Sequence, residues 1–146
     1  MEYPVKVSFP VHWGEMDALG HVNNARFFAW LETARIALFE RIGILADKPR
    51  EIGPILATIQ CDFVRPVVYP ARIVVRTGVS KIGRTSITMA YEIVREDAPE
   101  EPCARATSVA VLVDYRTMAT VPVPDDIRAA IASLGPSAAQ AFAAKG

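Results

Sequence analysis

One long apolar helix is the feature of this sequence that does most to limit the fold. From Ala25 to about Ile42, apolar residues recur at helical spacing and charged residues occupy the remaining angles. Asn23 and Asn24 are suited to cap the start of such a helix, and Gly43 to end it. Because the apolar stripe is wide, the helix must be covered over much of its circumference. The stripe consists of Phe27, Phe28, Trp30, Leu31, Ala34, Ala37, Leu38, Phe39 and Ile42.

Alternating patterns elsewhere in the chain predict strands that cover this helix. One strand is expected before the helix and four after it, and short turns between them indicate antiparallel neighbours. This order predicts an α+β fold in which a curved antiparallel sheet of about five strands wraps one long central helix. The expected strands span residues 3–12, 55–64, 72–81, 85–95 and 103–115, with a hairpin loop at 96–102 and a short helix from Pro122 to about Ser133.

Length and composition indicate a single globular domain. The chain has 146 residues, of which 51% are hydrophobic, and no internal repeat divides it. We expect the domain to span residues 1–134 and the Ala-rich residues 135–146 to form a tail. A formal net charge of zero provides no overall attraction for nucleic acid. No apolar run is long enough to span a membrane and no apolar signal core is visible, so we expect a cytoplasmic protein.

The two cysteines show no pattern that indicates a disulfide or a metal site. Cys61 and Cys103 lie far apart, each in an apolar run typical of a strand. This placement favours buried free thiols in a reducing compartment. Because no Cys/His spacing matches a zinc site, no bound metal is expected.

The loop before the long helix carries the residues best suited to chemistry. The first N–H groups of a helix have no internal partners and carry partial positive charge, which suits a developing oxyanion. Asp17 lies just upstream, on a loop that Gly20 allows to bend tightly. A carboxylate in this position can attack a carbonyl or activate a water molecule. The loop therefore supplies a nucleophile or base together with a polarising site, without a metal or cofactor.

Residues 13–28 resemble the signature of 4-hydroxybenzoyl-CoA thioesterase-like hotdog proteins. In this segment, Trp-Gly-Glu-Met-Asp-Ala-Leu-Gly-His-Val-Asn-Asn-Ala-Arg-Phe-Phe, a D-x-x-G-H-V-N-N-like loop leads into the hotdog helix. Residues 63–66 and 81–86 are also similar to family segments, and the resemblance covers roughly residues 3–120. It implies a hotdog fold, a homodimer whose two sheets join edge to edge or a tetramer of such dimers, and active sites at the subunit interface.

The resemblance also implies an activity and residue roles. The implied reaction is hydrolysis of an acyl-CoA thioester to a carboxylic acid and CoA, with Asp17 as nucleophile or general base. CoA is then part of the substrate, and no cofactor is implied. The backbone N–H of Asn24 is expected to help polarise the thioester carbonyl. Some relatives use a histidine at this position, and many carry a tyrosine where this chain has Phe27.

Other loop residues have both a chemical and a structural interpretation. His21 could orient Asp17 or line the pocket, and it could equally hydrogen-bond the loop backbone. Gly20 and Asn23 are expected to shape the loop around the substrate, with Asn23 also acting as a helix cap. Asp17 itself could simply form an Asx turn.

A second carboxylate competes with Asp17 for the catalytic role. Another branch of hotdog thioesterases uses a glutamate on the helix, and Glu32 is a candidate for that role. Glu32 lies three residues before Arg35, a spacing that suits an ion pair on one helix face. We therefore interpret the pair as structural.

Three basic residues are candidates to bind the phosphates of CoA. Lys81 and Arg84 flank an expected hairpin turn, and Arg65 precedes Pro66. Phosphate groups require arginine or lysine partners, which makes these positions suitable. The alternative is that each is a solvated surface charge.

Two other functions stay open at this point, because a fold does not determine a function. The chain could bind acyl-CoA or an acyl-carrier protein without catalysis, using the same pocket. It could also be a hotdog enoyl-CoA hydratase, although no matching Asp/His motif is visible.

Overall fold

A five-stranded antiparallel sheet and one long helix make up most of the structure. The computed structural model describes residues 3–44 and 51–134. The strands pair in the order β1-β3-β4-β5-β2. Their bounds are β1 (Val5–Pro10), β2 (Ile52–Phe63), β3 (Arg72–Ile82), β4 (Ser86–Arg95) and β5 (Ala98–Asp114). The helices are α1 (Asn24–Ile42), α2 (Asp125–Ser133) and a short 3-10 turn, η1 (Trp13–Glu15).

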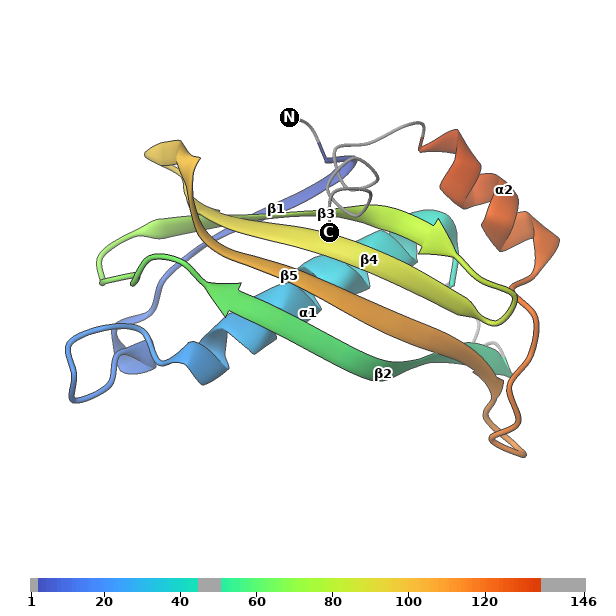
Figure 1. Cartoon of the computed structure of the whole chain (residues 1–146). Coiled ribbons are helices and arrows are strands. Elements are labelled where there is room, and N and C mark those ends of the chain that lie inside the picture. Colours follow the sequence, from blue (N-terminus) through green and yellow to red (C-terminus); the bar gives the residue numbers. More distant parts are fainter. Residues whose placement is uncertain (1–2, 45–50, 135–146) are drawn as a thin grey trace.

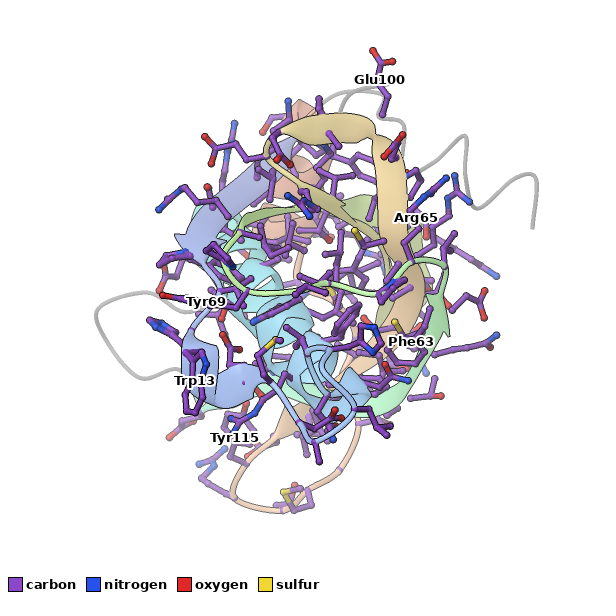
Figure 2. All side chains as sticks on the ribbon, turned by 90° about the vertical axis from the view of Figure 1, so that its left-hand side faces the viewer. Trp13, Phe63, Arg65, Tyr69, Glu100 and Tyr115 are labelled. Atoms are coloured by element: carbon purple, nitrogen blue, oxygen red, sulfur yellow. The ribbon has the colours of Figure 1, made fainter. Side chains whose placement is uncertain are left out.

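The sheet packs one face against α1. Figure 1 shows α1 lying across the sheet, and the end view of Figure 2 shows the sheet curving around it. Alternate residues of each strand point inward, as the period-two pattern predicts. Those of β3 and β4 bury their side chains in one core with the apolar stripe of α1. The fully buried members include Phe27, Leu31 and Leu38 of α1, Ile73 and Val75 of β3, and Ile87, Met89 and Ile93 of β4.

The predicted order of elements is confirmed. A strand precedes α1 and four antiparallel strands follow it. The short helix expected after Pro122 is α2, and its Ile127 and Ile131 join the core, so the described fold has a second helix beside the single central one named in the predicted fold class. Neither described helix is both long and apolar enough to cross a membrane. The expected tail at 135–146 lies outside the described residues.

The prediction of a hairpin loop at residues 96–102 is wrong. β4 ends at Arg95, a two-residue turn follows, and β5 begins at Ala98, which pairs with Arg95. The Arg95 guanidinium closes the turn by donating to both carboxylate oxygens of Asp97, at 3.0 and 2.9 Å. Pairing of β5 with β2 starts only at Ala104, so residues 98–102 form a free edge on that side. Prolines are tolerated on such an edge, which is why the two prolines of this segment do not end the strand.

Gly43 ends α1 as predicted. Its φ of 85° lies in the left-handed region, where glycine is favoured over other residues. The Gly43 N–H donates to the carbonyl of Glu40 at 3.2 Å, and the Ile44 N–H donates to that of Phe39 at 3.0 Å. These bonds satisfy carbonyl groups that the helix end would otherwise leave free.

A small polar cluster crosses the core between α1 and the sheet. The hydroxyl oxygens of Tyr91 and Ser108 lie 2.6 Å apart, and Arg35 Nη1 donates to Tyr91 Oη at 3.5 Å. All three side chains are buried. Burial raises the pKa of Tyr91, although hydrogen bonds to Ser108 and Arg35 oppose that shift. The neutral hydroxyl of Tyr91 therefore satisfies two polar groups that would be costly to leave unpaired.

Replacing Tyr91 with Phe should lower the free energy of unfolding by about 1–3 kcal/mol, because Ser108 and Arg35 lose a buried partner. Urea denaturation followed by circular dichroism measures this change. Tyr69→Phe is the matched control, since the Tyr69 side chain is 43% exposed. Equal losses in the two variants would show that the buried cluster contributes no particular stability.

Candidate functional site

The loop before α1 is a tight hairpin closed by backbone hydrogen bonds. The Asp17 N–H donates to the His21 carbonyl and the Gly20 N–H donates to the Asp17 carbonyl, each at 3.0 Å. Gly20 has a φ of +84°, which side chains other than glycine rarely adopt. Met16 and Val22 form an isolated bridge below the turn. Gly20 therefore serves the loop by its backbone conformation.

Both oxygens of the Asp17 carboxylate already accept one hydrogen bond. The Leu19 N–H donates to Oδ1 at 2.9 Å, and Asn23 Nδ2 donates to Oδ2 at 3.3 Å. The Asx turn considered from the sequence is thus present. A carboxylate offers about four acceptor positions, so two bonds leave lone pairs available to a ligand. Because Asp17 is half-buried, its position is defined and it can still be reached from solvent.

Asn23 joins the start of α1 to Asp17. Its Oδ1 accepts the Ala25 N–H at 2.8 Å, which is the expected helix cap, while its Nδ2 group donates to Asp17. Both ends of the side-chain amide are therefore fixed by the local structure. The sequence indicated the cap but not the bond to Asp17, because the folding-back of residues 17–21 brings the two side chains together.

Asn24 is the first residue of α1, and its side chain is exposed. In the part of the chain that the structure describes, its backbone N–H has no acceptor. An N–H in the first helical turn carries partial positive charge. It can therefore donate to an anionic or polarised oxygen beside Asp17.

Glu15 is a site residue that the sequence analysis missed. Its Oε1 accepts the His12 N–H at 2.7 Å and its Oε2 accepts the Trp30 indole N–H at 2.8 Å. The Glu15 carbonyl also accepts the Asn23 N–H, at 3.1 Å. Trp30 in turn stacks on Phe27, with ring centroids 4.9 Å apart. Glu15 thus anchors the loop to the buried aromatic side chains of α1. In the sequence, its position three residues after His12 was the signal that could have indicated a capping role.

Three recesses meet at this loop. The Asp17 recess, of about 230 Å³, is lined by Asp17, Leu19, His21, Val22, Asn23 and Asn24. The Phe63 recess, of about 190 Å³, continues past His21 and Asn24 to Phe63, Val64, Arg65 and Pro66. The Arg26 recess, of about 510 Å³, lies beside Asp17 and Asn23 and extends along Gly14, Glu15, Met16, Ala25, Arg26 and Ala29.

The structure brings together some of the predicted site residues. His21 is exposed and lines both the Asp17 and the Phe63 recesses, while its carbonyl holds the loop. Arg65 borders the Phe63 recess, but its Nη1 donates to the Pro102 carbonyl at 2.9 Å. Figure 2 shows Arg65 and Phe63 on the same side of this end of the molecule. Arg65 therefore lines a recess beside the loop, and one of its guanidinium N–H groups is already bonded to β5.

Lys81 and Arg84 lie elsewhere in the protomer. Lys81 lies near the end of β3 and Arg84 lies in the turn between β3 and β4, which Figure 1 places at the end of the sheet opposite the 11–23 loop. The Arg84 carbonyl accepts hydrogen bonds from the Val123 N–H and from the Arg128 side chain, so α2 and the residues before it hold this turn. Within one chain these two residues cannot share a small ligand with Asp17.

Within one protomer, Glu32 lies too far along α1 to act together with the loop before the helix. It follows Asn24 by eight residues, which corresponds to about 12 Å along the helix axis. Its carboxylate is 3.8 Å from Arg35 Nη2, and its side chain is 68% exposed. Glu32 lines none of the three recesses described above, and the ion pair expected from the sequence is present.

Aromatic side chains form the apolar wall next to the recesses. The ring of Phe63 lies edge-on to Phe27 and Phe28, with centroids 5.3 and 6.1 Å away.

Cys61 precedes Phe63 by two residues on β2, so the two side chains share a face. Burial, with a smaller effect from Asp62, raises the pKa of the Cys61 thiol to about 11. Cys61 is therefore a protonated thiol at neutral pH and a poor nucleophile.

Comparison with known proteins identifies the family of this chain. The family model of the thioesterase-like superfamily matches residues 11–131. The chain belongs to this superfamily. The relationship to hotdog thioesterases expected from residues 13–28 is confirmed, and the sheet curved around α1 fits a hotdog fold.

Three relatives illustrate the similarity. The PA2801 protein of Pseudomonas aeruginosa is 34% identical, with a TM-score of 0.81 over 89% of this chain and 99% of that one. A thioesterase of Thermus thermophilus, complexed with coenzyme A and Zn, is 29% identical, with a TM-score of 0.77 over 90% and 94% of the two chains. The Bacillus subtilis protein YsmA is 28% identical over 116 residues, which cover 80% of this chain and 77% of YsmA.

Replacing Asn23 with Ala should lower the free energy of unfolding by about 1 kcal/mol, because α1 loses its cap. Asn24→Ala is the matched control and should stay within about 0.5 kcal/mol of the parent, since its side chain is exposed and makes no described hydrogen bond. Urea titration of the two variants compares them directly. A larger loss for Asn24→Ala would contradict the assignment of the cap.

Proposed function

We propose that this protein hydrolyses an acyl-CoA thioester, with Asp17 as the catalytic carboxylate. One observation carries the proposal: Asp17 and Asn24, whose backbone N–H has no acceptor among the described residues, line the same recess. A thioester carbonyl placed between them meets a base or nucleophile and a hydrogen-bond donor at once. Membership of the thioesterase-like superfamily supports the reaction class.

In the proposed mechanism, Asp17 attacks the thioester carbonyl or removes a proton from the attacking water. The carbonyl oxygen gains negative charge in either case. The Asn24 N–H, at the positive end of the helix dipole, stabilises that charge as the tetrahedral species forms. In the general-base route the thiolate leaves with the proton that Asp17 took from water, and the carboxylic acid is released directly. In the nucleophilic route the thiolate is protonated by solvent and leaves an Asp17–acyl anhydride, which a water molecule hydrolyses to release the carboxylic acid and restore Asp17. Asn23 and the Leu19 N–H hold the carboxylate in place by the hydrogen bonds described above.

The surroundings of the loop support a thioester with an apolar acyl group. The Phe63 recess adjoins Asn24 and is walled by an aromatic side chain and by Val64. Burial of apolar acyl carbons there is favoured at about 25 cal/mol per Å². The Thermus thermophilus relative that binds coenzyme A supports CoA as the carrier. His21 borders both recesses and is proposed to contact the substrate near the thioester.

We also propose that two copies of the chain associate through β2. Among the described residues, β2 pairs with β5 on one side and has no strand on the other. It is a long edge strand, and such edges aggregate unless they are covered. Leu56 on β2 is 41% exposed and Ile36 on α1 is 40% exposed, which leaves apolar surface beside the edge. Antiparallel pairing with a second copy would cover both and follows a twofold axis.

Replacing Asp17 with Asn should lower kcat/KM for acyl-CoA substrates by at least about 100-fold, because the variant has neither a base nor a nucleophile. Thiol release from a panel of acyl-CoA thioesters, followed with a thiol-reactive dye, measures the effect. Asp97→Asn is the control, since Asp97 is an exposed aspartate that closes the β4–β5 turn with Arg95 and lines none of the three recesses.

Other outcomes of the same panel favour the other functions. If the parent binds acyl-CoA but releases no thiol from any member, the chain is a binding module and not a hydrolase. If it adds water to an enoyl-CoA and leaves the thioester intact, it is a hydratase. A variant Asp17→Asn with full hydrolytic activity would remove Asp17 from the catalytic role.

Replacing Leu56 with Lys should convert a dimer into a monomer, because a charge would be buried at the proposed β2 interface. Sedimentation equilibrium measures the mass of the parent and the variant. Val68→Lys is the matched control, since Val68 is 40% exposed and lies in the loop between β2 and β3. A parent that is monomeric at all concentrations would contradict the proposed pairing.

A further inference from the structure

We propose that Arg26, in the Arg26 recess, binds an anionic group of the thioester substrate. The group is a phosphate of the carrier or a carboxylate of the acyl chain, which share the same chemistry toward a guanidinium. The inference rests on the proposed thioesterase function and names a binding residue for it.

Arg26 is a cation without a described partner. Its side chain is exposed on the first turn of α1, and no ion pair or side-chain hydrogen bond joins it to residues 3–44 or 51–134. The other arginines of α1 are engaged, Arg35 with Tyr91 and Arg41 with the Pro4 carbonyl. Arg26 therefore keeps its five N–H donors for a ligand or for water.

The three basic residues that the sequence suggested as phosphate ligands are less suited to bind an anion beside Asp17. Arg65 lines the Phe63 recess, but its guanidinium donates to the Pro102 carbonyl. Lys81 and Arg84 lie at the opposite end of the sheet within one protomer. Of the described arginines and lysines that line the three recesses, Arg26 is the one with no partner.

The Arg26 recess is open toward Asp17. Its lining includes Asp17 and Asn23, and it includes the small side chains of Ala25 and Ala29 on α1. Its other carboxylate, that of Glu15, already accepts hydrogen bonds from the His12 N–H and the Trp30 indole. These bonds offset part of the negative charge that would otherwise repel an anion. The first turn of α1 adds partial positive charge beside Arg26.

Arg26 and the apolar wall lie on different sides of α1. Phe28 lies two positions after Arg26, which corresponds to roughly 200° around the helix axis. Phe28 faces Phe63, whereas Arg26 lines the recess on the other side of Asp17. A thioester bound at Asp17 would then send one arm toward the aromatic wall and the other past Arg26. An amphipathic thioester with an anionic group on one arm fits this division.

Arg26→Ala tests the proposal with three substrates that share the reacting thioester. They are a neutral acyl-CoA, the same acyl group on pantetheine, which carries no phosphate, and an acyl-pantetheine with a terminal carboxylate. A phosphate ligand predicts a roughly tenfold loss in kcat/KM for the acyl-CoA relative to the neutral acyl-pantetheine. A carboxylate ligand predicts a similar loss for the carboxylated substrate relative to the neutral one. Either loss should shrink at high ionic strength.

Lys6→Ala is the matched control, because Lys6 is an exposed cation on β1 and lines none of the three recesses. If the parent hydrolyses these substrates and Arg26→Ala changes neither ratio, the inference is overturned while the proposed function stands. If the parent hydrolyses none of them, the proposed function fails. Calorimetric titration with coenzyme A and with the carboxylated pantetheine thioester then decides the role of Arg26, because unchanged affinities in the variant would exclude it.

Discussion

Burial of α1 against the inward face of the sheet is the constraint on which the rest of this structure depends. The helix presents apolar side chains over a wide arc, and a flat sheet would cover only part of it. The sheet curves, and its alternating residues fill the space around Phe27, Leu31 and Leu38. Because such interiors are closely packed, the axis and the rotation of α1 are both determined. The position of its first turn, where the candidate site lies, follows from that packing.

A few hydrogen bonds fix the loop before α1 to this packed helix. Trp30, buried in the core, holds Glu15, and Glu15 holds the backbone of Asn23. Asn23 then caps the helix with one end of its side chain and reaches Asp17 with the other. A carboxylate on a surface loop is thereby fixed relative to the free N–H of Asn24. Placement of this precision is what electrostatic catalysis requires.

The surface around the loop divides by polarity. Aromatic and aliphatic side chains lie on the side of α1 that faces β2, whereas Arg26, which has no partner among the described residues, lines a recess on the other side of Asp17. This division fits an amphipathic thioester better than a small polar substrate. It also leaves apolar residues near the β2 edge, where pairing with a second copy would bring partner residues close to the Phe63 end of the site. The proposed dimer interface at β2 and the proposed substrate site would therefore adjoin each other.

The sequence by itself determined the order of the elements, the start and end of α1, and the segment that forms the candidate site. These depend on local signals: helical periodicity, an asparagine cap, a glycine stop and strand alternation. Local signals misjudged residues 98–102, because the tolerance of β5 for proline there depends on where its pairing with β2 begins. The tertiary structure alone decided that Glu15 anchors the loop, that Asn23 reaches Asp17, and that Lys81 and Arg84 lie far from both. Each of these depends on contacts between residues distant in the chain or on chain reversal, and a one-dimensional pattern carries no information about such distances.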